Sequence, residues 1–118
     1  MIKGIGIDIV EIARVATSIK QNVRFVERIL TAREQKEYEK LSTHRRKVEF
    51  VAGRFAAKEA FSKAMGTGLG KLSFQDIEIH NDELGAPHLI CQKTNEHVWV
   101  SISHSVDYAV AQVILEQK

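Results

Sequence analysis

The chain has 118 residues, of which 44% are hydrophobic and 27% charged, and its formal net charge is +2. This length suits one domain with its own core and is too short for two, and the apolar content argues against disorder. No apolar run approaches the roughly 18 residues that a membrane span needs, and the N-terminus lacks the basic-then-apolar layout of a secretory signal. We therefore expect a single domain over residues 1–118, with no membrane association. The single cysteine, Cys91, excludes an internal disulfide and fits a reducing cytoplasm.

The positive charge is concentrated in one part of the chain. Residues 12–50 hold ten Lys and Arg against five Glu, a charge of +5 that leaves −3 for the remainder. This imbalance favours an acidic partner, which could be a nucleic acid, a membrane surface, an acidic protein or a phosphorylated ligand. The alternative is a solvated helical face on which the basic and acidic residues form ion pairs. Few aromatic residues stand among these bases, which argues against a stacking platform for single-stranded nucleic acid.

The predicted elements begin with a strand and continue with helices. Within residues 1–10, Ile5, Ile7 and Ile9 alternate with smaller or polar residues, so we expect a strand whose isoleucine face is buried. Residues 11–65 are typical of helices, and the longest helix is expected over 45–65. Thr31, with Glu34 three positions later, forms a capping-box pattern that marks a helix start.

A glycine-rich loop and a run of short strands follow. Gly66, Gly68 and Gly70 end the long helix, and residues 81–87 form a turn. The expected strands are 76–80, 88–91, 97–103 and 108–115. The order of one strand, then helices, then several strands predicts an α+β fold rather than an alternating α/β fold.

Asp8 is the first residue whose placement suggests chemistry. It shares a strand face with Gly4 and Gly6, so its carboxylate projects from a surface almost bare of side chains. Glycines at such positions allow a ligand, or another part of the backbone, to come close. The alternative is an edge strand whose polar face contacts water.

Glu59 is the second such residue. On a helix, Val48, Ala52 and Phe55 fall close to it, so its carboxylate lies within an apolar stripe. An ionised carboxylate in such a place needs a cation, which could be Lys63 one turn later or a bound metal. Two carboxylates without Cys or clustered His suit a hard ion such as Mg²⁺.

Three further features could bind phosphate groups. Lys58 and Lys63 stand close to Glu59, and the amides of the loop that begins at Gly66 could hold phosphates, although this loop could equally be a helix C-cap. The segment 101–105 (Ser-Ile-Ser-His-Ser) places hydroxyls and an imidazole at a strand end. Adjacent strand residues face opposite ways, which argues against a Ser–His nucleophile and favours a phosphate contact. The remaining histidines have no metal-ligand spacing and are expected at the surface: His44, His80, His88 and His97.

Several of these segments together resemble the holo-(acyl-carrier-protein) synthases, specifically the short, trimeric group of 4′-phosphopantetheinyl transferases. The matching segments are Gly-Ile-Gly-Ile-Asp-Ile-Val-Glu-Ile at 4–12, Arg-Phe-Ala-Ala-Lys-Glu-Ala-Phe-Ser-Lys-Ala at 54–64, Gly-Thr-Gly at 66–68 and Ser-Ile-Ser-His-Ser at 101–105. Their order and spacing match over nearly the whole chain. No segment decides alone, but the set is specific.

This resemblance implies a reaction and roles for named residues. The family transfers 4′-phosphopantetheine from coenzyme A to a serine of apo acyl carrier protein, releases 3′,5′-ADP and serves fatty acid biosynthesis. It implies that Asp8 and Glu59 bind Mg²⁺ and that Lys63 lies near the pyrophosphate. The base for the serine would be Glu59 or a water on the metal. The residues implied in binding the coenzyme's phosphates are Arg46, Arg54, Lys63, Gly66, Thr67, Gly68 and His104.

The basic N-terminal third then has a partner. Acyl carrier proteins are small and acidic, so Arg14, Arg24 and Arg28 are the expected docking cations. The family also implies a homotrimer with active sites between subunits, and neither nucleic acid nor membrane as a partner. The competing hypothesis is a non-catalytic basic module that binds nucleotides or nucleic acid, which would have no need of two carboxylates in apolar surroundings.

Overall fold

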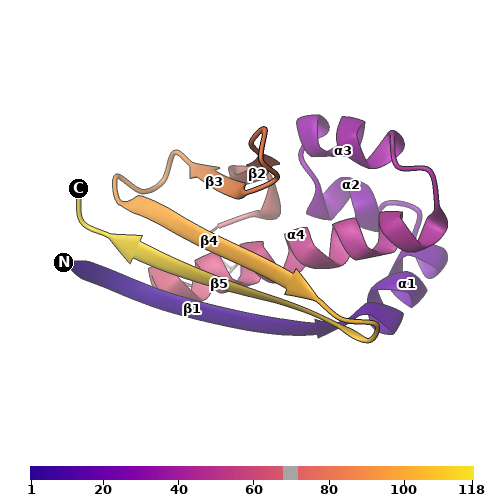
Figure 1. The fold of residues 1–118 in the computed structure, drawn as a ribbon, viewed down its shortest axis with the longest axis horizontal. Helices are drawn as coiled ribbons and strands as arrows, with labels where there is room; N and C mark the ends of the chain where they lie inside the picture. The colour runs from indigo at the N-terminus through magenta and orange to yellow at the C-terminus, as the bar shows by residue number, and fades with distance from the viewer. Residues whose placement is uncertain (68–71) are drawn as a thin grey trace.

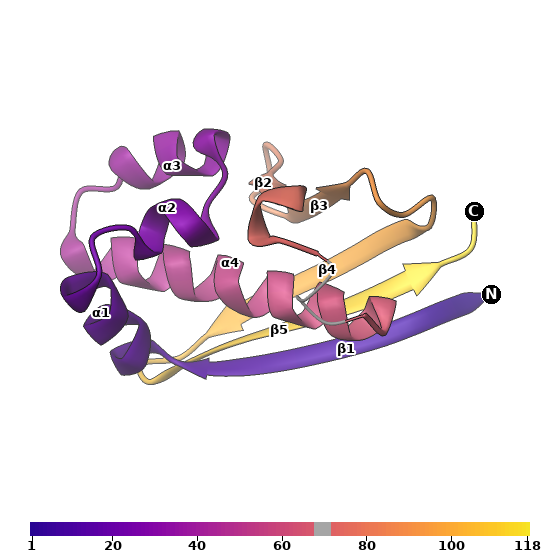
Figure 2. The same ribbon diagram turned by 180° about the vertical axis from the view of Figure 1, so that it is seen from behind.

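The computed structural model describes residues 1–67 and 72–118, and a long central helix organises it (Figure 1). Helix α4 lies between a three-stranded sheet and a further layer of short helices and a β-hairpin (Figure 2). In chain order the elements are β1 (Ile2–Glu11), α1 (Ile12–Gln21), α2 (Phe25–Ile29), α3 (Ala32–Glu39), α4 (His44–Met65), the 3₁₀ turn η1 (Phe74–Asp76), β2 (Ile77–Asn81), β3 (Pro87–Cys91), β4 (His97–His104) and β5 (Tyr108–Glu116). The predicted α+β class is confirmed.

The helical region is divided where the sequence supplies caps. Asn22 follows α1, and its side-chain oxygen accepts a hydrogen bond from the Arg24 amide at 3.0 Å, a local turn that ends the helix. The capping box at the start of α3 is confirmed, because Thr31 and Glu34 exchange both of its hydrogen bonds. Helix α4 starts one residue before the prediction, after Thr43 as N-cap. It ends at Gly66, whose left-handed φ of 76° is the C-cap conformation.

The main sheet joins the two ends of the chain. Its strand order is β1-β5-β4, all antiparallel, with Ile5 opposite Ile114 in the β1–β5 pair. The carbonyl of Met1 accepts a hydrogen bond from the Gln117 amide at 2.9 Å, so the two termini lie side by side (Figure 1). Strands β2 and β3 form a separate two-stranded sheet closed by a turn at Gly85. The predicted strand ends differ from the observed ones by a single residue.

The expectation that the isoleucine face of β1 is buried is wrong within a single chain. Ile5, Ile7 and Ile9 are 57%, 58% and 64% exposed, while the face with Gly4 and Gly6 packs against α4. The reason is steric: a Cβ at Gly6 would overlap the carbonyl oxygen of Ala60, and one at Gly4 that of Ala64. The glycines therefore let helix backbone lie directly on strand backbone, and the isoleucines face outward.

Both sides of α4 are covered. Toward the sheet, Ala57, Ala60 and Ala64 share one core with Ala111 and Val113 of β5. A second core surrounds the first half of α4, where Val48, Val51 and Ala52 pack with residues of α1 and α2. This double coverage fixes the helix that carries Glu59.

Candidate active site

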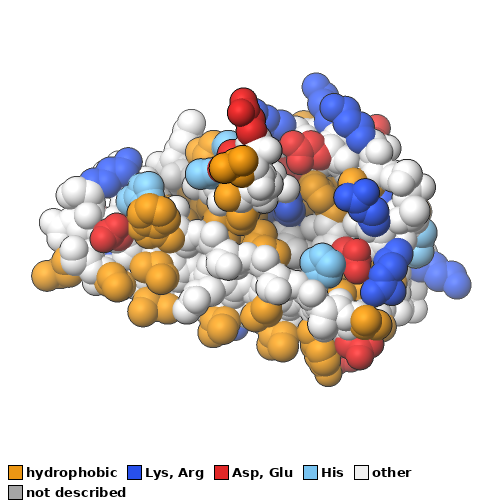
Figure 3. Space-filling model, viewed as in Figure 1, with side chains coloured by type: hydrophobic (Ala, Val, Ile, Leu, Met, Phe, Trp, Pro, Cys, Tyr) orange, Lys and Arg blue, Asp and Glu red, His pale blue; other side chains and the backbone are white. Residues whose placement is uncertain are grey.

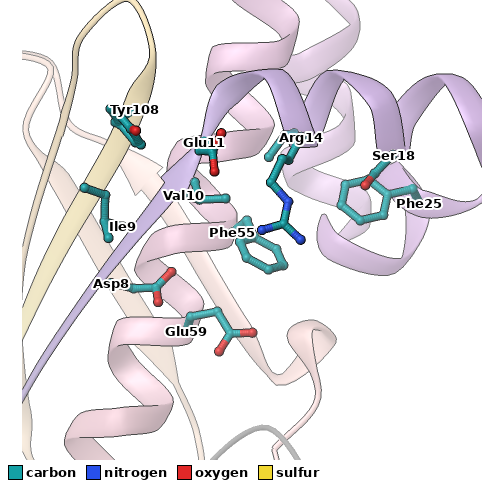
Figure 4. Close-up of a pocket in the computed structure, with 11 residues that line it drawn as sticks. Asp8, Ile9, Val10, Glu11, Arg14, Ser18, Phe25, Phe55, Glu59 and Tyr108 are labelled. Carbon is teal, nitrogen blue, oxygen red and sulfur yellow. The ribbon is translucent and has the colours of Figure 1, made fainter.

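The two carboxylates singled out in the sequence lie in one cleft. Asp8 comes from β1 and Glu59 from α4, and both side chains line a cleft of about 430 Å³ at the junction of these elements with α1 (Figure 4). Asp8 projects from the glycine face of β1, which α4 covers, so the alternative of a polar face in water is wrong. The side chains of Asp8 and Glu59 are both half-buried.

Lys63 contacts Asp8 instead of Glu59. Its Nζ lies 3.0 Å from Oδ1 of Asp8 and also donates to the carbonyl of Ile7 at 3.0 Å. The predicted ion pair between Lys63 and Glu59, one turn apart on α4, is therefore not formed. Within residues 1–67 and 72–118, the Glu59 carboxylate has no basic side chain within 4 Å. Its partner has to come from outside this set.

The electrostatics of the cleft favour a cation. Burial raises the pKa of Glu59 above its ordinary value, and the negative charge of Asp8 raises it further, while Lys63 opposes the shift in part. Two half-buried carboxylates that disfavour each other's charge form a donor set of hard oxygen atoms. Such a set fits Mg²⁺, which takes one or two protein carboxylates and completes its shell with water and phosphate oxygens.

Lys58 does not bind phosphate, contrary to the expectation from its position beside Glu59. Its side chain is fully buried on the opposite side of α4, where Nζ lies 2.6 Å from Oε1 of Glu34. Glu34 is separated from Lys58 by 24 positions, so nothing in the local sequence predicts this pair. Of the two lysines, only Lys63 lies on the side of α4 that carries Glu59 and Asp8.

Arg54 is also buried, but it keeps unused hydrogen-bond donors. Its guanidinium packs over the ring of Phe50, 4.2 Å from the centroid, and Nη2 lies 3.9 Å from the carboxylate of Glu37. Nε and Nη2 have no hydrogen-bond partner among the described residues. Buried donors of this kind carry a desolvation penalty that a suitable acceptor would remove.

His104 and Arg46 lie away from the carboxylates. His104 ends β4, and its Nδ1 is 3.6 Å from Glu49, which also pairs with Arg45 at 3.3 Å. This group is visible as a cluster of blue, pale blue and red side chains at one end of the molecule (Figure 3). Glu49 precedes Glu59 by ten residues on α4, a helical rise of about 15 Å. The two groups also lie toward opposite edges of the sheet, since β1 and β4 flank β5.

The three docking arginines are exposed, and one of them lines the cleft. Arg14, on the first turn of α1, lies beside Asp8 and Glu59 (Figure 4). Arg24 and Arg28 lie at the start and within α2, one turn apart, with both side chains in solvent. All three therefore occupy the helices at the mouth of the cleft.

Three aromatic residues of the cleft, Phe25, Phe55 and Tyr108, were not predicted as site residues. Phe25 of α2 and Phe55 of α4 form its apolar wall (Figure 4). Phe55 stands four residues before Glu59 in the stripe that drew attention to the glutamate, so the spacing contained that signal. Phe25 reaches the cleft through the fold of α1 and α2, which no local pattern encodes.

The glycine loop is described only in its first part. Gly66 is the C-cap of α4, which confirms the C-cap alternative for this residue, and Thr67 is exposed. Gly68, also predicted to contact phosphate, lies outside the described residues.

The remaining histidines were expected at the surface. No group of three or more His, Cys, Asp or Glu in residues 1–67 and 72–118 is arranged to hold a metal. His44, His88 and His97 are exposed, and His80 is half-buried. In this part of the chain, no helix combines the length and apolar character required to cross a membrane.

Comparison with known proteins decides the family. The family model of the 4′-phosphopantetheinyl transferase superfamily matches residues 4–113. The chain belongs to the 4′-phosphopantetheinyl transferase superfamily. The match includes every segment on which the resemblance rests, and the resemblance is confirmed.

Individual members of this superfamily are similar over their full length. The holo-[acyl-carrier-protein] synthase of Oceanobacillus iheyensis is 56% identical, with 100% of this chain and 99% of the relative covered. That of Anoxybacillus flavithermus is 59% identical over 99% of this chain and 98% of the relative. The crystal structure of a holo-(acyl-carrier-protein) synthase from Bacillus anthracis, in complex with CoA (3′,5′-ADP), has a TM-score of 0.93 and 54% identity, covering 100% of this chain and 99% of that one.

Proposed function

We propose that this chain transfers 4′-phosphopantetheine from coenzyme A to a serine hydroxyl of apo acyl carrier protein. The serine oxygen forms a bond to the phosphorus that carries pantetheine, the pyrophosphate P–O bond breaks, and 3′,5′-ADP leaves with the bridging oxygen. The observation that carries the proposal is that Asp8 and Glu59 line one cleft at the junction of β1 and α4, with Lys63 paired to Asp8. The whole chain, residues 1–118, acts as one transferase domain.

The residues of the cleft have distinct roles in this reaction. Asp8 and Glu59 would hold Mg²⁺, which when bound neutralises charge on the pyrophosphate. Lys63, already aimed at Asp8, donates to phosphate oxygens as negative charge develops on the leaving group. Glu59 or a water takes the serine proton.

A second group of residues binds the remaining phosphates of the coenzyme. Arg54 supports this role with its two unused buried donors, for which a phosphate oxygen is a suitable acceptor. Arg46 and His104 add positive charge and a hydrogen-bonding imidazole at the same end of α4. The amides of Gly66 and Thr67 and the hydroxyl of Thr67 contribute at the end of α4 that carries Lys63, and Gly68 is expected to contribute as well.

A complete site requires more than one copy of the chain. His104 lies at the far end of α4 from the carboxylates, so one subunit presents the metal-binding half and another the His104 half. The outer face of the sheet supplies the interface: Ile5, Ile114 and Trp99 form one row across β1, β5 and β4, and Trp99 is 54% exposed. An apolar face of this kind is typical of subunit contacts. That the assembly has three subunits is implied by the resemblance to the family.

Acyl carrier protein docks on the helices beside the cleft. Arg14, Arg24 and Arg28 present an exposed basic surface next to the place where the serine must arrive. A cytoplasmic location goes with this substrate pair and with a chain that has one cysteine.

Mass spectrometry of apo acyl carrier protein tests the proposal. After incubation with the chain, coenzyme A and Mg²⁺, the carrier protein should gain the mass of one phosphopantetheine group. A carrier protein in which the acceptor serine is replaced by alanine serves as control and should gain nothing. An unmodified wild-type carrier protein, together with binding of nucleic acid by the chain, would favour the basic-module hypothesis instead.

A further inference from the structure

We propose that Lys58 is a positioning residue: its buried ammonium fixes α4 in the register that brings Glu59 opposite Asp8. This inference rests on the proposed function, because it concerns the two carboxylates to which that function assigns Mg²⁺. Lys58 itself does not line the cleft, and its side chain extends from the other side of α4.

The ammonium of Lys58 joins four elements. It donates to Oε1 of Glu34 at 2.6 Å, to the carbonyl of Ile29 at 2.8 Å and to that of Phe74 at 3.1 Å. An ammonium has three N–H groups, so all of its donors are used. One atom of α4 is therefore tied to the end of α2, to α3 and to the 3₁₀ turn η1.

Glu34 extends these ties to the hairpin. Its Oε1 also accepts from the Thr31 amide at 2.9 Å, and its Oε2 accepts from the Ile79 amide of β2 at 2.9 Å. The carboxylate and ammonium, both fully buried, are thus satisfied mainly by backbone groups. A shift of α4 would have to break or lengthen several of these buried hydrogen bonds at once, which leaves buried polar groups unsatisfied.

The opposite side of α4 packs on the sheet, and its hydrogen bonds to β1 come from Lys63, which donates to Asp8 and to the carbonyl of Ile7. There α4 rests on Gly4 and Gly6 of β1, and the contact is between helix carbonyls and strand backbone. Without side chains from these two positions, few groups interlock to oppose sliding or rotation of the helix on β1. The metal ligands sit on these two elements, Asp8 on β1 and Glu59 on α4. Lys63 restrains α4 from the β1 side, and Lys58, adjacent to Glu59, restrains the same part of α4 from the other side.

A purely stabilising ion pair is the competing explanation, and it makes a different prediction. A buried pair can be replaced by apolar residues of similar volume without loss of stability. If Lys58 and Glu34 served stability alone, such a double replacement would restore both folding and the cleft. If Lys58 positions α4, the double variant regains stability but lacks the hydrogen bonds to Ile29 and Phe74.

The test uses Mn²⁺ as a paramagnetic substitute for Mg²⁺ and the full chain without coenzyme A. Binding of Mn²⁺, followed by electron paramagnetic resonance, is compared in wild type, the double variant Glu34→Leu/Lys58→Met and the single variant Glu34→Gln. Leu89→Ala, in a buried position of β3, is the matched control: it should lower stability while leaving the hydrogen bonds of Lys58 and Glu34 in place. Asp8→Asn tests the metal site itself.

We expect Mn²⁺ to bind about tenfold more weakly to the double variant, at the lower end of the range for groups that orient metal ligands. Glu34→Gln should weaken the binding of Mn²⁺ several-fold, and Leu89→Ala should leave that binding unchanged. A folded double variant with the dissociation constant of wild type overturns the proposal. If the double variant does not fold, a Glu34→Gln variant that binds Mn²⁺ with the dissociation constant of wild type overturns the proposal.

A second measurement separates this inference from the proposed metal site. In the metal-free protein, the NMR amide shifts of Gly4 and Gly6 report the position of α4 on β1. They should move in Glu34→Gln and stay constant in Leu89→Ala, and constant shifts in both would overturn the positioning role. Wild type that fails to bind Mn²⁺, or Asp8→Asn that binds it normally, would refute the metal assignment, while the amide shifts would still decide the role of Lys58.

Discussion

The ammonium of Lys63 on α4 lies 3.0 Å from the carboxylate of Asp8 on β1, and this pair spans the junction of the two elements. Sequence spacing favours Glu59 as the partner of Lys63, because residues one helical turn apart share a face. In the structure Lys63 pairs with Asp8 instead, and Glu59 has no basic partner among the described residues. The cleft is thus lined by three carboxylates, those of Asp8, Glu11 and Glu59, and by one cation, Arg14, and Lys63 borders it through Asp8. Asp8 and Glu59 together are the pair that a divalent cation would neutralise.

Removal of either carboxylate should abolish transfer while the fold persists. Asp8→Ala and Glu59→Ala should each lower kcat/KM by about two orders of magnitude or more, the scale typical of preorganised electrostatic groups. Circular dichroism and thermal unfolding should show a folded protein, since both side chains line a cleft instead of the core. Near-normal turnover of both variants at limiting Mg²⁺ would contradict the metal assignment.

The pKa of Glu59 should fall in an Asp8→Asn variant of the metal-free protein. Burial is the largest cause of the raised pKa and remains, but the charge of Asp8 is removed, so the new pKa lies between the wild-type and ordinary values. A raised pKa in the folded state means that protonated Glu59 favours folding at acid pH, and this contribution is lost as pH rises through the folded pKa. Carboxyl ¹³C NMR measures the titration. A pKa that stays constant or rises would show that Asp8 does not act on Glu59.

A charge on the outer face of the sheet should break the assembly. Ile7→Glu places a carboxylate in the middle of the apolar face, at a position that is 58% exposed in the single chain. We expect analytical ultracentrifugation to show a monomer that is folded but inactive, because the His104 half of the site comes from another subunit. Lys3→Glu, an exposed residue of the same strand, is the control for added charge. An active Ile7→Glu monomer would refute the shared site.

Charge reversal beside the cleft should weaken docking of the carrier protein. Arg14→Glu with Arg24→Glu should raise the KM for acyl carrier protein and reduce its dependence on salt, because exposed charges act mainly on association and are screened. The KM for coenzyme A should stay nearly constant, since Lys63 and the Gly66 segment bind its pyrophosphate. Steady-state kinetics across a salt series measures both. An unchanged KM for the carrier protein would show that these arginines only form surface ion pairs.

Alanine should be poorly tolerated at Gly6 and well tolerated at Gly53. The new Cβ at Gly6 would overlap the carbonyl oxygen of Ala60, which is backbone and cannot rotate away. We expect a loss of about 1–3 kcal/mol in the free energy of unfolding, as for overpacked cores. At Gly53 the nearest atom is a side-chain methyl of Ile102 at 3.2 Å, which can yield, and alanine favours helix. Denaturant titrations of both variants compare them directly, and equal stability would contradict the close contact.

The sequence predicted the elements well, but it predicted long-range relationships only in part. Capping signals located α3 and α4, because a cap depends on residues three or four apart. The break between α1 and α2 was missed, since a short polar turn resembles helical sequence. The inner face of β1 was misjudged because alternation shows which side chains share a face, not which face the same chain covers.

In the candidate site, too, local features were predicted and long-range contacts were not. Asp8 and Glu59 were found because a carboxylate stands out on a bare or apolar surface, a property that local spacing reveals. Lys58 was assigned to the wrong side of α4, and its partner Glu34 was seen only as part of a cap. Their contact is set by the packing of α3 on α4, which depends on the whole core.

The pairing of Ile5 with Ile114 bears on how the protein is made. During synthesis β1 emerges first, while β5, which separates it from β4, emerges last. The three-stranded sheet therefore cannot begin to form until nearly all of the chain has left the ribosome, and β1 must wait with its isoleucines uncovered. High sequence separation between partners slows folding. A circular permutant that joins the adjacent termini and opens the chain at the Gly85 turn would place β5 directly before β1 as a hairpin, and should refold faster than the natural order.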